Sequence, residues 1–410
     1  MRNFLISLFL LIPVLVISQP TQFRGLHRDG IYPDKGLLKE WPASGPELIM
    51  SAEGIGLGWS SAIVSDGIIY ITGMIDTIDY LSAISMTGQI LWKKPYGRSW
   101  TASFPDTRCT PTIEVNRIYV MSGTGTVVCF NAKDGSEIWS FDVDKVYGSK
   151  WDRWGVSESP LIVDDKLICT PGGSKASVIA LDKMTGKPVW ESPPTGGKRS
   201  YVSAVIYTYK NFRYILAMTY DDLLAVDPGT GTIIWKFPFN SQKPGDKTIP
   251  INSPVYKDDQ IYLSNGYNYP SIMLKLADDG KSVSIKWMDD NLDNHHHGLV
   301  LLDNYIYGSN WLNNTKGEWV CLDWNSGEVK YVKEWFCKGP VITADNMLYV
   351  IDEKNGNVGL VKPSPDGFDV VSTFKLTKER GEFWAHPTIY DGKLYLRYNN
   401  KLMVYDIREK

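Results

Sequence analysis

The sequence has few cysteines, and none of them stands in an arrangement that binds zinc or carries redox chemistry. Five cysteines are spread over 410 residues, with no adjacent pair and no CxxC. Because five is an odd number, at least one of them stays unpaired. A zinc or thiol redox motif is therefore not expected.

The chain also lacks an excess of charge of one sign. It has 43 Lys and Arg against 46 Asp and Glu, a net charge of −3. Because binding to nucleic acid needs a basic surface, no nucleic-acid partner is expected. With 43% hydrophobic and 22% charged residues, the chain can bury a core and is not disordered.

Common catalytic motifs are missing as well. There is no GxSxG, no P-loop, and no GxGxxG between a strand and a helix, while the glycine-rich Gly54–Gly58 precedes an expected strand and reads as a loop. The exact reaction, if there is one, is left open by the sequence.

Only one long hydrophobic run is present, at the N-terminus. Arg2 precedes an apolar stretch, Phe4–Ile17, that is interrupted by Ser7 and Pro13. At about 14 apolar positions it is shorter than the roughly 20 of a membrane span. Residues 1–18 therefore indicate a cleaved secretory signal, with an uncleaved anchor as the alternative. No cysteine lies near residues 15–22, so a lipoprotein anchor is not expected. We expect a periplasmic or secreted protein without a transmembrane segment after cleavage.

A repeated unit of short strands organises the rest of the chain. In the first copy, strands are expected at Ser61–Val64, Ile68–Tyr70 and Tyr80–Ile84, followed by a turn at Gly88 and an outer strand at Trp92. From Tyr70 to Tyr395 the seven steps between equivalent aromatic positions average about 46 residues, which four strands with their turns fill. A radial array of such units is a β-propeller.

The turn of each unit carries the most specific signal. In four copies a tryptophan follows the turn glycine by four residues: Gly88 and Trp92, Gly135 and Trp139, Gly186 and Trp190, Gly231 and Trp235. These tryptophans are expected to stack between neighbouring blades as a structural device. Copies five and seven depart from the spacing, so they are expected to pack their edges differently. Cys129 and Cys321 occupy a position where Ala180 and Ala225 stand elsewhere, and are expected to be small buried residues.

Eight copies are present, and the last is incomplete. Only three strands are expected between Thr388 and the end of the chain, so the N-terminal Pro46–Ser51 is predicted to supply the fourth and close the ring. We expect an all-β, eight-bladed β-propeller of four-stranded blades closed by an N-terminal strand. Its parts are a signal peptide (1–18), a lead-in with the ring-closing strand (19–51) and the propeller (52–410). Seven blades remain the alternative if copies five and six are misregistered.

The segments 180–190 (ALDKMTGKPVW) and 225–235 (AVDPGTGTIIW) resemble the tryptophan-docking repeat AxDxxTGxxxW of PQQ-like, quinoprotein-type propellers. The lead-in FRGLHRDG at 23–30 and the segments WGVSESP at 154–160 and NHHHG at 294–298 resemble a broad group of exported bacterial members. The resemblance covers essentially the whole chain after residue 18. It implies the fold, and it spans both quinone-dependent alcohol and sugar dehydrogenases and the assembly propeller BamB, which is not an enzyme.

In a propeller, the residues just before each innermost strand surround a central funnel, where ligands usually bind. Four of them are predicted to serve catalysis, if there is any: His296, His297, Arg108 and Glu158. The others are predicted to bind ligand: Trp59, Trp154, Tyr201, Asn252, Lys338, Trp384 and His386. Histidine could act as a general acid or base near neutral pH, Arg108 or Lys338 could neutralise a carboxylate, and tryptophan faces suit sugar rings or quinones.

Alternatives stay open for several of these residues. His295–His297 could be an exposed loop without a ligand, Glu158 could pair with Arg108 or Lys338, and Trp59 and Trp384 could be packing residues. No metal site is predicted, because consecutive side chains point apart and three adjacent histidines would need His386 or Glu158 as well.

The sequence therefore predicts an exported propeller whose funnel binds a small polar ligand, a carbohydrate or sugar acid, with catalysis undecided. One alternative is a scaffold like BamB that holds an envelope protein partner. Another is a dehydrogenase with PQQ and calcium, against which the missing adjacent cysteine pair and the missing haem CxxCH count. Glu158 and Asn252 could supply only part of a calcium site.

Overall fold

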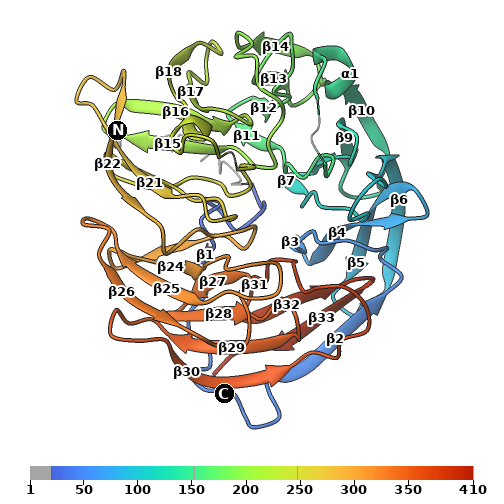
Figure 1. Cartoon of the computed structure of the whole chain (residues 1–410). Coiled ribbons are helices and arrows are strands. Elements are labelled where there is room, and N and C mark those ends of the chain that lie inside the picture. Colours follow the sequence, from blue (N-terminus) through green and yellow to red (C-terminus); the bar gives the residue numbers. More distant parts are fainter. Residues whose placement is uncertain (1–19, 151–152, 247, 410) are drawn as a thin grey trace, which may run out of the picture.

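The protein is a ring of β-sheets arranged around a central axis (Figure 1). The computed structural model describes residues 20–150, 153–246 and 248–409. Within these ranges there are eight blades of four strands each, one of which carries a fifth strand. The predicted eight-bladed propeller is confirmed. The export signal expected at 1–18 lies outside the described residues.

The blades follow one another in chain order, with the first strand of each near the axis and the last at the rim (Figure 1). Blades one to three comprise β3 (Ile63–Ser65), β4 (Ile68–Ile75), β5 (Ile78–Ser85), β6 (Ile90–Arg98); β7 (Thr112–Glu114), β8 (Arg117–Met121), β9 (Thr126–Asn131), β10 (Glu137–Asp142); and β11 (Leu161–Val163), β12 (Lys166–Cys169), β13 (Ile179–Asp182), β14 (Pro188–Glu191). Blades four to six comprise β15 (Val205–Tyr209), β16 (Phe212–Met218), β17 (Leu223–Val226), β18 (Ile233–Phe237); β19 (Val255–Lys257), β20 (Gln260–Leu263), β21 (Ser271–Leu276), β22 (Val283–Asp289); and β23 (Val300–Leu302), β24 (Tyr305–Ser309), β25 (Trp319–Asp323), β26 (Val329–Lys333). Blade seven comprises β27 (Val341–Ala344), β28 (Met347–Ile351), β29 (Asn357–Lys362) and β30 (Asp369–Lys375). The described residues add two short helical segments after outer strands, α1 (Val143–Tyr147) and the 3₁₀ turn η1 (Phe239–Ser241).

The two ends of the chain build the eighth blade together. β31 (Thr388–Tyr390), β32 (Lys393–Tyr398) and β33 (Lys401–Asp406) come from the C-terminus, and β2 (Glu47–Glu53) pairs antiparallel with β33. The predicted closing strand is confirmed. Because β2 covers the outer edge of β33, the last blade does not end on an unpaired C-terminal strand.

Three of the four repeated tryptophans dock on the turn glycine of the neighbouring blade, as predicted, whereas Phe212 and Tyr214 are nearest to the fourth glycine, Gly280. Trp92, Trp139 and Trp190 each lie on the turn glycine of the next blade, where an added Cβ would come within 2.4–2.7 Å of the indole. Each tryptophan also faces a small residue on the third strand of its own blade: Trp92 faces Ala83, Trp139 faces Cys129, Trp190 faces Ala180 and Trp235 faces Ala225. Cys129 and Cys321 are fully buried at this position, which confirms their role as small core residues.

The fifth copy of the repeat packs more like the other copies than its spacing between glycine and tryptophan predicts. Trp287 lies on Gly327 of the next blade, just as the other docking tryptophans do. The prediction that copy five packs differently is therefore wrong, because the extra residues lengthen the paired strands β21 and β22 and leave the indole in place. Copy seven does differ: Phe374 of β30 packs against Trp41 of the N-terminal lead-in at 5.1 Å between ring centroids.

Residues 20–32 lie in the middle of the ring, an arrangement that the sequence did not predict. Arg28 donates hydrogen bonds to the carbonyl oxygens of Ser159, Pro160 and Ala204, at 2.5–3.1 Å, on blades three and four. Arg24 reaches the opposite blades, six and seven. A segment that contacts blades on both sides of the axis must cross the central channel.

Arg24 donates to the carbonyl oxygens of Leu299 and Val341 at 2.6 and 3.1 Å, and its Nη1 lies 2.9 Å from Nδ1 of His386. β1 (Ile31–Tyr32) then pairs parallel with β27, as the fifth strand of blade seven. Burial lowers the pKa of both arginines to about 10, so both remain charged at neutral pH. The lead-in is therefore an integral part of the core.

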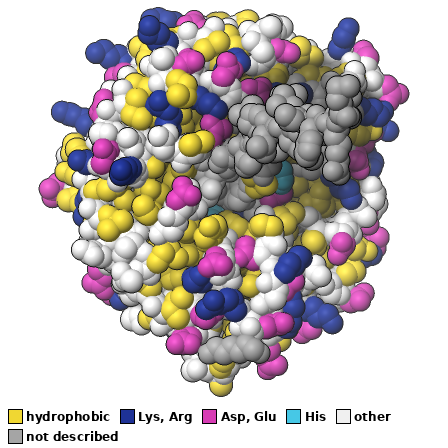
Figure 2. Space-filling model, turned by 180° about the vertical axis from the view of Figure 1, so that it is seen from behind, with side chains coloured by type: hydrophobic (Ala, Val, Ile, Leu, Met, Phe, Trp, Pro, Cys, Tyr) yellow, Lys and Arg dark blue, Asp and Glu magenta, His cyan; other side chains and the backbone are white. Residues whose placement is uncertain are grey.

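Charges of both signs are interspersed on the surface. Figure 2 shows Lys and Arg side chains mixed with Asp and Glu over the face that it displays. This mixture agrees with the nearly balanced composition. In the described part of the chain, no helix is both long and apolar enough to cross a bilayer.

Candidate functional site

A cavity of about 830 Å³ opens where the innermost strands begin. Eight of the predicted site residues line it: Trp59, Arg108, Trp154, Tyr201, His296, Lys338, Trp384 and His386. They come together because each stands a few residues before the innermost strand of its own blade. The structure therefore brings most of the predicted set into one funnel.

The other three predicted residues do not line this funnel. Glu158, Asn252 and His297 are 1%, 7% and 0% exposed, and each is engaged by other groups of the protein. Their positions before the innermost strands are as predicted, but their side chains are turned into the blades. A site composed of all eleven residues is therefore not what the structure shows.

Glu158 belongs to a buried ion cluster. Its Oε2 accepts a hydrogen bond from Arg199 at 2.7 Å, and its Oε1 accepts one from the backbone amide of Thr170 at 2.9 Å. Arg199 also pairs with Asp144 on α1 at 2.5 Å. Burial raises the pKa of Glu158, and the positive charge of Arg199 opposes that rise. The predicted pairing of Glu158 with Arg108 or Lys338 is wrong, because Arg199 pairs with its carboxylate.

Asn252 holds the loop that carries the histidines. Its side-chain amide donates to the carbonyl oxygens of Ser264, Asn294 and His295, at 3.1 and 2.7 Å for the first two. Its Oδ1 accepts from the amide of Gly298 at 3.3 Å. The side chain therefore acts on loop 294–298 and not on the funnel.

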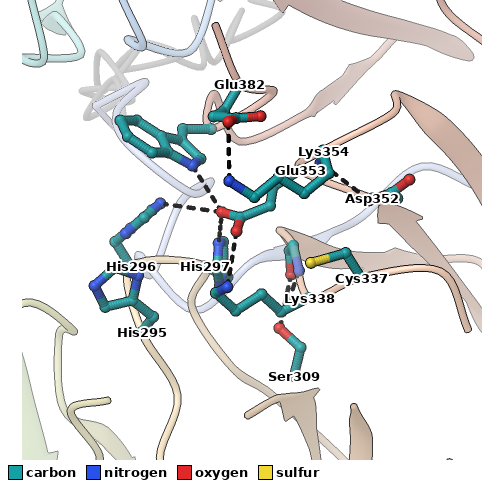
Figure 3. Close-up of polar contacts among 12 residues, drawn as sticks. His295, His296, His297, Ser309, Cys337, Lys338, Asp352, Glu353, Lys354 and Glu382 are labelled. Atoms are coloured by element: carbon teal, nitrogen blue, oxygen red, sulfur yellow. Dashed lines mark hydrogen bonds and ion pairs between the residues drawn. The ribbon is translucent and has the colours of Figure 1, made fainter. Parts of the chain in front are cut away.

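Glu353 is the centre of the polar network beside the funnel (Figure 3). Its carboxylate lies 2.9 Å from Nζ of Lys338 and 3.0 Å from Nε2 of His297, and it accepts a 2.7 Å hydrogen bond from the indole of Trp384. Burial would raise the pKa of Glu353, but the hydrogen bond from His297 and the charge of Lys338 outweigh it and lower the pKa to about 2. Glu353 is therefore a fixed negative charge.

The histidines are weaker bases than the sequence suggested. Burial lowers the pKa of His295 to about 3 and holds the pKa values of His296 and His386 well below their ordinary range. The expected pKa near neutrality is wrong for these residues, because little solvent reaches the rings. They are neutral at pH 7 and poorly suited to abstract a proton.

An aromatic wall stands on one side of the funnel. The Trp384 ring lies 4.8 Å from Trp59, 5.8 Å from Phe104 and 4.9 Å from His296, measured between ring centroids. The guanidinium carbon of Arg108 lies 5.2 Å from the Trp59 ring, within cation–π distance. Trp59 and Trp384 therefore pack against neighbouring rings and also line the funnel.

Arg108 has hydrogen-bonding capacity to spare. Its Nη2 donates to the carbonyl oxygen of Phe104, whereas its buried Nη1 has no hydrogen-bond partner among the described residues. Burial lowers the pKa of Arg108 to about 10, so the group is charged at neutral pH. A partly buried cation with an unused donor is suited to receive an anionic oxygen.

Several lining residues were missed by the sequence reasoning. Tyr220, Tyr267 and Glu353 stand in loops between the second and third strands of their blades. Strand direction alternates within a blade, so these loops open on the same face as the segments before the first strand. That alternation is the signal that could have found them. Phe23 was missed because the lead-in was not expected in the channel.

A second cavity, of about 660 Å³, lies along the N-terminal segment. Arg24, Arg28 and Asn252 line it, and Phe23, His296 and His386 border both cavities. Residues 23–28 thus stand between the two spaces.

The funnel does not fit PQQ held by calcium. Of the two residues expected to provide part of a calcium site, Glu158 is saturated by Arg199 and Thr170, and Asn252 directs its amide at backbone carbonyls. Neither lines the funnel. Calcium coordination needs several free oxygen ligands, which this pair does not offer.

Comparison with known proteins gives three relevant similarities. The family model described as "Outer membrane protein assembly factor BamB" matches residues 78–333. BamB of Kangiella koreensis is 22% identical over 227 residues, 53% of this chain and 50% of that protein. A quinohemoprotein alcohol dehydrogenase of Pseudomonas putida is 25% identical over 173 residues, 40% of this chain and 24% of that protein. The matched regions thus span half or less of these curated relatives.

Solved structures show the same fold at low identity. The crystal structure of BamB from Moraxella catarrhalis superimposes with a TM-score of 0.63 at 15% identity, over 88% of this chain and 99% of that one. Quinohemoprotein alcohol dehydrogenase from Comamonas testosteroni gives a TM-score of 0.71 at 13% identity, over 96% and 81%. The family model matches more than half of this chain. The chain therefore belongs to the PQQ-like β-propeller family whose model is described as the assembly factor BamB.

Proposed function

We propose that the funnel binds a small anionic polar ligand, a sugar acid or related carbohydrate. The observation that carries this proposal is the partly buried guanidinium of Arg108, whose shielded Nη1 lacks a hydrogen-bond partner among the described residues. It stands beside the exposed aromatic wall. A cation and a stacking surface at one position suit a carboxylate attached to a sugar ring.

The size and lining of the funnel support the same class of ligand. Its volume of about 830 Å³ lies within the range of roughly 300–1,000 Å³ that is typical of small-molecule sites. Trp59, Trp384 and Phe104 offer ring faces, and the phenol groups of Tyr201 and Tyr267 add hydroxyls to the lining. Of the other cations in the lining, Lys338 is paired with Glu353, Lys354 is paired with Glu382, and Arg153 is exposed to solvent. Arg108 is therefore the preferred anchor for a carboxylate.

The proposal concerns binding and assigns no proton-abstraction step. The neutral, buried histidines are weak bases, and Glu353 is held as an ionised, fully engaged carboxylate. From the export signal predicted at residues 1–18, we propose that the protein works in the cell envelope or outside the cell.

Replacing Arg108 by alanine should weaken binding of an acidic oligosaccharide by about 10- to 100-fold, because a charged hydrogen bond contributes about 1.5–3 kcal/mol. The measurement is isothermal titration with a panel of neutral and uronic-acid oligosaccharides, after a thermal-shift screen. Arg98→Ala, on the exposed side of the outer strand β6, is the matched control and should bind like the wild type.

An acidic sugar that binds Arg108→Ala as tightly as the wild type would overturn this assignment. His297→Ala, which the sequence alone would have favoured as a test, is unsuitable because His297 is fully buried on Glu353 and its loss would lower stability.

A second candidate is a scaffold for envelope protein assembly, favoured by the description of the family model. It predicts no affinity for any sugar in the panel. It also predicts one envelope protein retained at a 1:1 ratio, with binding unchanged by Arg108→Ala. A ligand-dependent thermal shift that Arg108→Ala removes would exclude an inert funnel.

A further inference from the structure

We infer that His295, His296 and His297 form a site for a divalent transition-metal ion, of the class of Zn²⁺, at the wall of the funnel. One ring nitrogen from each histidine lies within 4.8 Å of the others. The three rings lie side by side in Figure 3, with centroid distances of 4.2, 4.3 and 5.9 Å. This inference does not depend on the organic ligand proposed for the funnel.

The sequence predicted the opposite, because side chains of consecutive residues in a strand point apart. Residues 294–298 are not a strand: the chain bends at His296 and His297, and Gly298 has a φ of +71°. In a bent segment, adjacent side chains can turn to the same side. The absence of a metal site was predicted from extended geometry, which this loop does not have.

The hydrogen bonds around two of the rings leave one nitrogen of each free. Nε2 of His297 faces the carboxylate of Glu353 at 3.0 Å, so it carries the proton, and Nδ1 holds a lone pair. Nε2 of His295 lies 2.8 Å from the hydroxyl of Tyr267. A carboxylate or hydroxyl behind the distal nitrogen is the usual support of a metal-binding histidine, since it fixes the ring and its tautomer.

Three ring nitrogens are shielded from solvent, and one of them, Nε2 of His296, lies 3.8 Å from the carboxylate of Glu353. Nδ1 of His295, Nε2 of His296 and Nδ1 of His297 have no hydrogen-bond partner among the described residues, and each of these atoms is shielded from solvent. A buried polar atom without a partner costs about 1–3 kcal/mol. One ion that accepts a lone pair from each ring would satisfy a nitrogen of all three histidines.

The loop is held in place before any ion binds. Asn252 donates to the carbonyl oxygens of Asn294 and His295, and the side chain of Asn294 donates to the carbonyl oxygen of Ser309 at 2.7 Å. Nitrogens around Zn²⁺, at about 2.0–2.1 Å from the ion, lie roughly 3.3 Å apart. Small ring rotations about fixed backbone positions would close the remaining gap.

The donor set selects the kind of ion. Three neutral imidazoles suit zinc, copper or nickel and not calcium or magnesium, which prefer oxygen. The nearby positive charge of Lys338 is balanced by Glu353 at 2.9 Å. Because His295 and His296 line the funnel, a fourth coordination position would face the cavity, as in zinc sites that keep a position for water or ligand.

The test is metal binding by the untagged, purified protein after treatment with a chelator. We expect one equivalent of Zn²⁺ by elemental analysis, and the visible absorption of four-coordinate Co²⁺ when cobalt replaces zinc. His296→Gln should weaken Zn²⁺ binding by at least about 100-fold, the upper end of the loss seen for an outer-shell partner. His296 is partly exposed, so this variant should fold, which its melting temperature will show.

Two further variants make the result specific. Tyr267→Phe removes only the hydroxyl behind His295 and should weaken binding by about 10-fold. His27→Gln removes an exposed histidine elsewhere and should change nothing. Less than about 0.1 equivalent of metal in the wild type, or equal affinity in His296→Gln and His27→Gln, would overturn the inference. Neither result would bear on sugar binding at Arg108, which is measured without metal.

Discussion

A chain that begins at Gly54 should fail to form a stable ring. The deletion removes β2, which covers β33 along its length, and β1, which pairs with β27. It also removes the buried side chains of Leu37, Trp41 and Met50. Each buried large side chain contributes about 2–5 kcal/mol, so the total loss is on the order of 10 kcal/mol. That is comparable to the whole stability of a typical domain, about 5–15 kcal/mol.

The lead-in contributes through its arginines as well. Without Arg28, the carbonyl oxygens of Ser159, Pro160 and Ala204 lose their donor inside the ring. An unsatisfied buried acceptor costs about 1–3 kcal/mol. The deletion therefore weakens the inner side of blades three and four, far along the chain from the removed segment.

Urea denaturation and size-exclusion chromatography measure this effect. Point variants on β2 provide the matched comparison: Met50→Ala, at a buried position, should lower the free energy of unfolding by about 2–4 kcal/mol, whereas Leu48→Ala, at a half-exposed position, should change it little. A shortened chain that unfolds at the wild-type urea concentration would show that the ring does not need its N-terminal strand.

Replacing Arg199 by methionine should lower the free energy of unfolding by about 3–5 kcal/mol, because it removes the counter-charge from a buried carboxylate. Arg199 is 2% exposed and contacts Glu158 at 2.7 Å and Asp144 at 2.5 Å. The exposed pair of Arg213 with Asp164 serves as the control. Arg213→Met should cost less than about 1 kcal/mol, since exposed ion pairs contribute little.

The loss in Arg199→Met should depend on pH. Burial already raises the pKa of Glu158 above its ordinary value, and without Arg199 the rise is no longer opposed. A folded state with a raised carboxyl pKa binds protons more tightly than the unfolded state, so its stability falls as pH rises. The variant should be closest to the wild type below about pH 4.5, the ordinary glutamate value, and most destabilised at neutral pH.

A second substitution separates this explanation from simple loss of packing. Arg199→Met with Glu158→Gln removes the buried charge and should recover part of the stability at pH 7. Equal instability of the single and double variants at pH 4.5 and pH 7.5 would contradict a buried-charge origin.

The fold was predictable because each blade repeats its own local signals. A glycine turn, a tryptophan four residues later and a small residue opposite it occur together in blade after blade, and the shortfall at the C-terminus pointed to β2. The position of Trp287 was misjudged because a longer strand pair changes the spacing from glycine to tryptophan without changing where the indole packs. The path of residues 20–32 through the channel leaves no periodic signal at all.

The candidate site was only partly predictable. The place of a residue in the repeat tells whether it lies near the funnel, but not in which direction its side chain points. Arg108 and Trp384 were found because any residue just before an innermost strand is near the funnel. That Glu158 turns to Arg199 depends on a partner 41 residues away in the sequence, and no spacing rule indicates it. Glu353 was missed because it stands in a different kind of loop, although that loop opens on the same face.

The N-terminal lead-in that crosses the channel has a consequence for the movement of a ligand through the ring. Residues 23–28 separate the funnel from the cavity on their other side, and Arg24 and Arg28 fasten that partition to blades on opposite sides of the axis. A molecule bound in the funnel would therefore rest against a fixed segment of chain and not against an open channel.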